Sequence, residues 1–221
     1  MNDGPMTKDA PRWAPLTGGL FVAIAVAIFA VAGDTPDAND RTARQIVAYY
    51  SDHDGAVIAS VGLALIACAL LVFFCAYLSS VLEGDLLPRV AFAGGVILAV
   101  GLAIDVTISV ALVHSADHID PVAVQALSSL YSNDFIPFVL GAMLIVLASG
   151  LAIVRQDNLP HWLGWLGIAL ALPAPTPLGA ITFVGAGIWI LLASVVLWTC
   201  GRGPSRLETD VQPPARALDL A

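Results

Sequence analysis

Six apolar runs separated by short polar segments dominate the chain, and this pattern predicts a bundle of membrane-spanning helices. Crossing the hydrocarbon layer of about 30 Å takes about 20 helical residues. Five runs reach that length, whereas the fifth along the chain is short and is followed by Pro173, which does not fit inside a helix. The predicted fold is therefore an all-α integral membrane protein, a six-transmembrane-helix bundle with spans at about 13–32, 56–82, 90–113, 135–154, 160–173 and 178–200.

Two of the polar segments between the predicted spans carry apolar residues at helical spacing, so two short amphipathic outer helices are expected there. Asn39 or Asp40 is suited to cap the first, and Asp120 followed by Pro121 is suited to begin the second. We expect both helices to pack over the mouth of the bundle or along the membrane interface. The residues expected to make this contact are Ala43, Ile46, Val47 and Tyr50 in the first helix, and Val124, Leu127, Leu130 and Tyr131 in the second.

Basic residues fall mainly on one side of this predicted bundle. With the N-terminus inside, seven of the nine lie on the inner side, and only Arg41 and Arg44 lie outside. Because basic residues favour the cytoplasmic side, we expect both termini in the cytoplasm, with an N-terminal tail at 1–12, the bundle at 13–200 and a disordered C-terminal tail at 201–221. The seven inner residues are Lys8, Arg12, Arg89, Arg155, Arg202, Arg206 and Arg216.

The first apolar run has a second interpretation. Ala30, Val31 and Ala32 form an A-x-A pattern before Gly33, which resembles a signal-peptide cleavage site. Removal of residues 1–32 would leave five spans and an external N-terminus. The mass of the mature protein distinguishes the two interpretations.

Composition narrows the function classes. Hydrophobic residues make up 58% of the 221 residues and charged residues 12%, and the mean hydropathy is +0.86. A soluble domain carries about twice that share of charge, so a soluble enzyme is excluded, and a net charge of −8 excludes a nucleic-acid binder. The chain also lacks HExxH, GxSxG, Walker and GxGxxG motifs, so we expect neither enzymatic activity nor a cofactor.

Small residues recur every four positions in the third predicted span, a spacing that lets another helix approach closely. Packing inside the bundle is one use of this row. Contact with a membrane-protein partner or a second copy of the chain is the other. The row includes Ala91, Gly95, Ala99 and Ala103.

Asp105 is the one acidic or basic residue well inside a predicted span. By helical rise it lies about 5 Å outward of the middle of the run 90–113. Desolvation penalises a charged carboxylate there, so the neutral acid is expected at neutral pH. One interpretation is structural, with the protonated carboxyl bonded to a neighbouring hydroxyl. The other is an intramembrane proton or cation site formed by Asp105 and Ser109, one turn further on.

Histidines provide the second candidate site. His114 and His118 lie one helical turn apart with Asp117 between them, and His53 lies in the other outer segment. HxxxH spacing occurs in metal sites, so these four residues are a candidate metal or proton site on the outer face. Solvated loop histidines are the alternative interpretation.

Three segments carry a family resemblance: Gly33–Asp37 (GDTPD), Gln45–Tyr50 (QIVAYY) and Leu159–Gly167 (LPHWLGWLG). In these segments and in its layout, the chain resembles uncharacterised polytopic membrane proteins common in actinobacteria, of the domain-of-unknown-function type. The resemblance implies a multi-helix inner-membrane protein, and it supplies no catalytic residues.

These observations favour a multi-pass protein of the bacterial cytoplasmic membrane that acts as a non-enzymatic accessory or structural subunit. The alternative is a small proton- or cation-linked transporter that uses Asp105, and a membrane-embedded enzyme is the third interpretation. A water-lined cavity reaching Asp105 would favour the transporter. A dry bundle with an exposed patch of small residues would favour the subunit.

Overall fold

The computed structural model describes residues 13–32, 41–82, 84, 86–115, 118–156 and 159–200, and the regular secondary structure among them is helical. The two predicted tails lie outside these ranges. Within them the helices are α1 (Leu16–Ala32), α2 (Ala43–Asp52), α3 (Asp54–Val81), α4 (Leu86–Ser115), α5 (Pro121–Asn133), α6 (Ile136–Arg155), α7 (His161–Ala171) and α8 (Gly179–Cys200).

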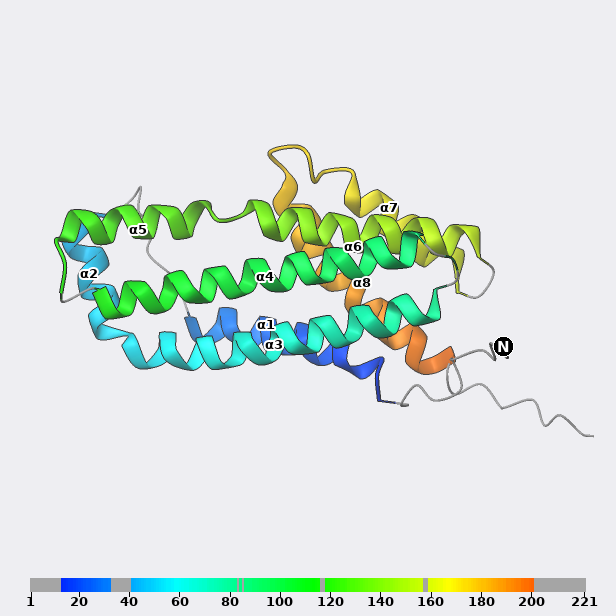
Figure 1. Ribbon diagram of the computed structural model, residues 1–221, viewed down its shortest axis with the longest axis horizontal. Helices are drawn as coiled ribbons and strands as arrows, with labels where there is room; N and C mark the ends of the chain where they lie inside the picture. Colours follow the sequence, from blue (N-terminus) through cyan, green and yellow to red (C-terminus); the bar gives the residue numbers. More distant parts are fainter. Residues whose placement is uncertain are drawn as a thin grey trace, which may run out of the picture.

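Six helices form a bundle in which α6 packs against α4, α7 and α8, while α1 packs between α3 and α8 (Figure 1). The helices α3 and α4 are neighbours along most of their length. The inward faces share one apolar core, which we call the bundle core. Among its largest buried side chains are Leu71, Phe74, Leu98, Ile145 and Trp189.

Each of the six predicted spans coincides with a helix to within four residues at either end. Four stretches of the described chain are long and apolar enough to cross a membrane: α3, α4, α8 and Pro121–Arg155, which comprises α5 and α6. With 17 and 11 residues, α1 and α7 rise about 26 Å and about 17 Å, which is less than the hydrocarbon layer. Six spans were predicted, but only these four stretches meet the length requirement. The predicted fifth span, 160–173, is shortest because α7 ends at Ala171, just before Pro173.

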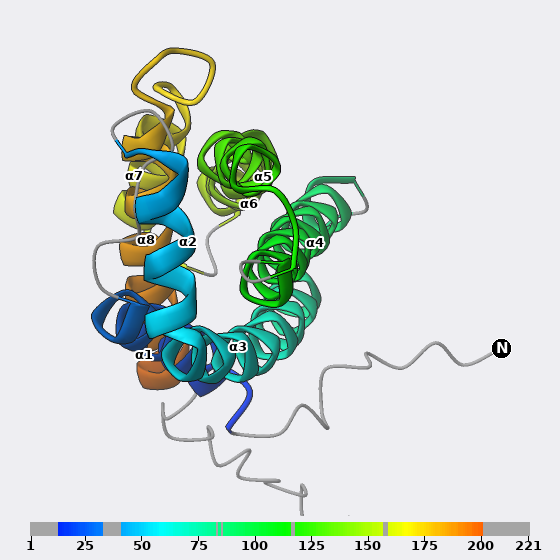
Figure 2. The same cartoon turned by 90° about the vertical axis from the view of Figure 1, so that its left-hand side faces the viewer.

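At one end of the molecule, α2 and α5 pack against each other and against α4, next to the start of α3 (Figure 1 and Figure 2). We call this end the cap. It has a core of its own, the cap core, whose buried members come from all four helices. They are Ile46, Tyr50, Val57, Ile108, Leu112 and Val124.

The two predicted amphipathic helices are therefore present, and three details are now defined. Thr42 precedes α2, and its backbone N–H donates to Gln45 Oε1 at 2.9 Å. The residues predicted to cap this helix, Asn39 and Asp40, lie outside the described residues. Asp120 caps α5 as predicted, because its carboxylate accepts from Val122 N at 2.8 Å.

The buried face of α5 differs from the prediction at one position. Leu130 was expected to face the bundle, but it is 57% exposed, whereas Ser128 is fully buried. The buried face follows the spacing of Val124, Leu127, Ser128 and Tyr131, which is i, i+3, i+4 and i+7. The prediction included Leu130 because it is hydrophobic, but its position around the helix places it next to the buried face and not on it.

The row of small residues on α4 packs inside the chain. Ala91, Gly95 and Ala99 are buried, and a Cβ atom on Gly95 would lie 2.5 Å from the sulfur of Cys75 on α3. The Cys68 thiol, also on α3, donates to the Ala99 carbonyl at 3.5 Å. The helix that approaches this row is therefore α3 of the same chain, whereas Ala103 at its outer end is half-buried.

Candidate functional site

Asp105 lies on α4 between the two cores. Leu98 and Ala99, which precede it on α4, belong to the bundle core. Ile108 and Leu112, which follow it, belong to the cap core. A 30-residue α4 therefore runs through both parts of the molecule, and the half-buried Asp105 marks the boundary between them.

Asp134 lies at the same boundary between the two cores, in the connection between α5 and α6. It follows α5, whose Val124 lies in the cap core, and precedes α6, whose Ala142 lies in the bundle core. Asp105 and Asp134 are close enough to interact electrostatically, and we call them the carboxyl pair. The Asp134 Oδ2 atom is buried, and it has no hydrogen-bond partner among the described residues.

Hydroxyl groups surround the carboxyl pair on the cap side. Ser109 donates to the backbone carbonyl of Asp105 at 3.0 Å, and the Tyr131 hydroxyl lies within hydrogen-bonding reach of Ser109. Tyr50 is 2% exposed. Burial raises the pKa of its hydroxyl, and Tyr131, Tyr49 and Asp105 raise this pKa further. The predicted pair Asp105 and Ser109 thus belongs to a larger cluster that joins α2, α4 and α5.

Among the helix segments around this cluster, only α2 carries a Lys or Arg, the exposed Arg44. The segments 55–82 of α3, 90–113 of α4, 121–133 and 136–154 contain no Lys or Arg. Their single acidic residue is Asp105. The negative charge of an ionised carboxyl pair would therefore face tyrosine and serine hydroxyls and apolar side chains. Such a site favours uptake of a proton or a cation.

The histidines of the second candidate site are exposed and separately bonded. His114 Nδ1 pairs with the Val110 carbonyl at 2.9 Å, and His118 Nδ1 pairs with the His114 carbonyl at 3.0 Å. His53 Nδ1 pairs with the Tyr49 carbonyl at 3.0 Å, and its ring stacks on the Tyr49 ring. Asp117 lies outside the described residues. Among the described ones, no group of three or more His, Cys, Asp or Glu side chains could hold a metal ion.

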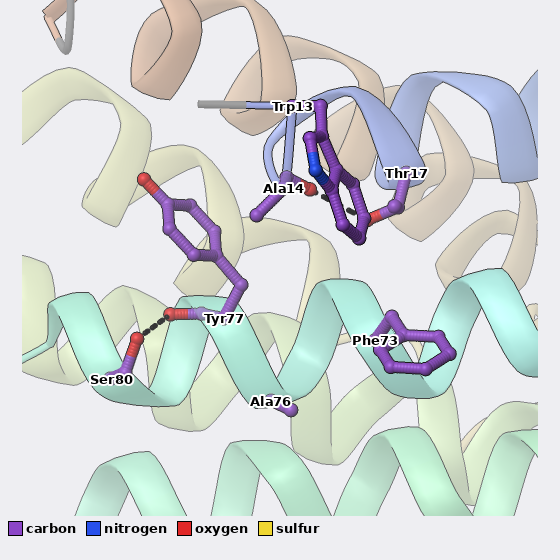
Figure 3. Close-up of a pocket in the computed structure, with 7 residues that line it drawn as sticks. All are labelled: Trp13, Ala14, Thr17, Phe73, Ala76, Tyr77 and Ser80. Carbon is purple, nitrogen blue, oxygen red and sulfur yellow. Dashed lines mark hydrogen bonds between the residues drawn. The ribbon is translucent and has the colours of Figure 1, made fainter. Parts of the chain in front are cut away.

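An open groove of about 310 Å³ lies between the start of α1 and the end of α3, at the end of the bundle away from the cap (Figure 3). Apolar surface dominates it, and two of its hydroxyls bond within their own helical turn: the Thr17 hydroxyl donates to the Ala14 carbonyl and the Ser80 hydroxyl to the Tyr77 carbonyl. The groove does not reach the carboxyl pair. Its lining residues are Trp13, Ala14, Thr17, Phe73, Ala76, Tyr77 and Ser80.

Sequence reasoning found Asp105 and Ser109 but missed Asp134, Tyr50 and Tyr131 as members of the same cluster. In the sequence, Asp134 stands in the polar segment just before the fourth apolar run, where nothing marks it as a site residue. A register between α4 and α6 was needed to place it. Gly101 of α4 lies next to Pro137 of α6. Because the two helices are antiparallel and have the same rise per residue, the turn of α4 after Gly101, which contains Asp105, lies at the level of Asp134.

Comparison with known proteins adds no relative: no protein-family model, no curated protein and no solved structure matches the chain. The resemblance to actinobacterial membrane proteins of unknown function stays a prediction.

Proposed function

We propose that the protein is a six-span protein of the bacterial cytoplasmic membrane, with both termini in the cytoplasm and the cap outside. Helix length supports this placement: twenty residues, about 30 Å, run from Leu86 to Asp105 in α4 and from Ile136 to Arg155 in α6. The hydrocarbon layer then ends at the carboxyl pair. The two shorter helices, α1 and α7, complete the crossing with their flanking residues.

Reporter fusions test this topology. Fusions after Leu82 and after Arg202 should read cytoplasmic, and fusions in the segment 43–52 should read external, because seven of nine basic residues lie on the proposed inner side. An external C-terminus would overturn the six-span arrangement.

Within this arrangement, we propose that the protein acts as a non-enzymatic structural subunit that associates through α3, the partner being a second copy of the chain. One observation supports it: small residues on α3 stay exposed at successive steps of three, seven and seven residues, on a face that is directed away from both cores and also carries the exposed Ile66 and Phe73. No atom of a neighbouring residue lies within 4 Å of the position that a Cβ on Gly62 would occupy. Such a face allows close helix approach. The exposed small residues are Ala59, Gly62, Ala69 and Ala76.

Cysteine cross-linking in membranes tests the association. In a chain whose three native cysteines are replaced by alanine, Ala69→Cys should give an oxidised dimer, and adding Gly62→Leu should remove it. Val184→Cys, on the exposed face of α8, is the matched control and should stay monomeric. Equal dimer yields at the two cysteine positions would reject α3 as the association face.

Proton- or cation-linked transport is a second candidate function, and the carboxyl pair favours it. Asp134 offers a buried, unpartnered carboxylate oxygen beside Asp105 at the proposed edge of the hydrocarbon layer. A titratable site in this position is suited to accept an ion from the outer side. The segments 55–82, 90–113, 121–133 and 136–154 supply no Lys or Arg to offset its charge, so that ion can balance it.

Flux into liposomes tests the transport function. Asp105→Asn keeps the side-chain shape but removes the titratable group, so it should abolish coupled proton or cation flux in a folded protein. Asp52→Asn changes an exposed acid of the cap and should leave flux unchanged. If wild type shows no flux above that of empty liposomes, transport is rejected and the subunit function stands.

A further inference from the structure

Among the described residues, two acids lie at the boundary where the cap is joined to the bundle. Asp105 lies on α4 between the residues of the two cores. Asp134 lies between α5 and α6, close enough to Asp105 to interact electrostatically. Both acids therefore lie where the cap rests on the bundle. The two helices that complete the cap, α2 and α5, reach this boundary through Tyr50 and Tyr131.

The titratable groups that face the carboxyl pair are known for every helix packed around it. They are Tyr50 from α2 and Tyr131 from α5, and Tyr49 lies beside these two tyrosines. The charged residues of α2, Arg44 and Asp52, are exposed, and α3 beyond Gly55 and α6 before Arg155 contain no charged residue. The tyrosines are neutral through the physiological range and cannot balance an anion. Two carboxylates in one poorly solvated site repel each other, so ionising both costs more free energy than ionising one.

We propose that the carboxyl pair is a pH-dependent switch, in which one retained proton keeps the cap docked on the bundle and loss of that proton loosens the cap. At low pH, the pair carries at most one charge and the two cores stay in register. At high pH, both carboxyls are ionised, and repulsion across the boundary drives water toward the buried Asp134 Oδ2 atom.

We expect the cap to loosen before the bundle does, because its helices need their contacts with the bundle to stay folded. The helices α2 and α5 have 10 and 13 residues, a length at which an isolated helix is marginal in water. The cap core has six buried apolar residues, far fewer than the bundle core. In the bundle, α4 and α6 contact each other through Gly94 and Gly141 at backbone distance, away from the charged pair.

Amide hydrogen exchange of the full chain in lipid nanodiscs tests the switch. At about pH 5, α2 and α5 should be equally protected in wild type and in Asp134→Asn. At about pH 8, wild type should exchange at least about tenfold faster in these helices than Asp134→Asn measured at the same pH, so that the intrinsic pH dependence of exchange cancels. A ratio that stays constant between the two pH values would overturn the proposal.

Three further measurements keep the result specific. Asp105→Asn should protect α2 and α5 at high pH as Asp134→Asn does, because either change removes the second charge. Asp52→Asn, an exposed acid of the cap, should exchange like wild type. Protection of α6 and α8 should stay constant with pH in all variants and shows that each is folded. Loss of protection throughout the bundle, or rescue by Asp52→Asn, would contradict a switch located at the carboxyl pair.

Discussion

The bundle and the cap are both helical, yet they are held together in different ways. In the bundle, glycines bring helices to backbone contact: Gly141 of α6 meets Leu98 of α4, and Gly150 of α6 meets Gly164 of α7. In the cap, side chains such as Ile46 and Val124 fill the space between helices. Backbone contact tolerates no added atom, whereas side-chain packing loses stability in proportion to what is removed.

The same difference appears in the polar groups. Trp189 in the bundle is fully buried, and its Nε1–H donates to the Leu163 carbonyl at 2.9 Å, so its one donor is satisfied. At the boundary of the cap, the Asp134 Oδ2 atom has no partner within the described residues. Buried hydroxyls without a partner among the described residues also occur in the bundle, on Ser149 of α6 and Thr182 of α8, but a hydroxyl keeps its neutral state. A buried carboxyl can change its charge, so the boundary of the cap is the site that is sensitive to protons, ions or water.

Adding a side chain at a backbone contact of the bundle should have the largest effect. In Gly141→Val, the Cβ atom would lie 2.6 Å from the Leu98 nitrogen and 2.8 Å from the Gly94 oxygen. Because these are backbone atoms, α4 and α6 must separate, and we expect a loss of about 3 kcal/mol or more. Thermal unfolding in detergent measures it. Gly187→Ala in α8, with open space around it, is the control and should be neutral or stabilise by up to about 1 kcal/mol.

A truncation in the cap core should have a large effect that stays local. Ile46 is fully buried in α2, so Ile46→Ala should cost about 2–5 kcal/mol of cap stability. Amide exchange should show lost protection in α2 and α5 with unchanged protection in α6. Ala48→Gly, at an exposed position of the same helix, is the control and should cost about 1 kcal/mol. Equal loss of protection in α6 would show that the cap and bundle unfold together and would remove the distinction between them.

The sequence predicts the bundle better than the cap for a physical reason. Apolar runs report burial in a membrane or core directly, so all six predicted spans coincide with helices. The length of a helix is harder to predict from the sequence: α7 ends at Ala171, although a helix that crosses the membrane was predicted there. The small-residue row of α4 correctly indicated a close helix neighbour, but identifying that neighbour as α3 required the three-dimensional arrangement.

The candidate site shows the same limit. Asp105 was recognisable because a charge inside an apolar run is costly. Its partners Asp134 and Tyr50 lie in segments that read as ordinary polar or amphipathic sequence, and only the register between α4, α5 and α2 brings them together. In α5, the choice between Leu130 and Ser128 depended on helical phase, which hydrophobicity alone decided incorrectly.

The smallest effect should come from a substitution at the start of α2. It tests how far the stability of the cap depends on the stability of this single helix. Gln45 Oε1 accepts from the Thr42 backbone N–H at 2.9 Å and from the Thr42 hydroxyl at 3.0 Å. Gln45→Ala removes both bonds at an exposed position where packing is unaffected, so we expect a loss of about 0.5–2 kcal/mol. A ten-residue helix has little stability of its own, so this loss should raise the exchange rates of α2 amides about tenfold while α5 and the bundle keep theirs. Arg44→Ala, the neighbouring exposed position, should leave the rates unchanged. If Gln45→Ala also loosened α5, the two cap helices would form one cooperative unit, and the cap would respond to the carboxyl pair as a single body.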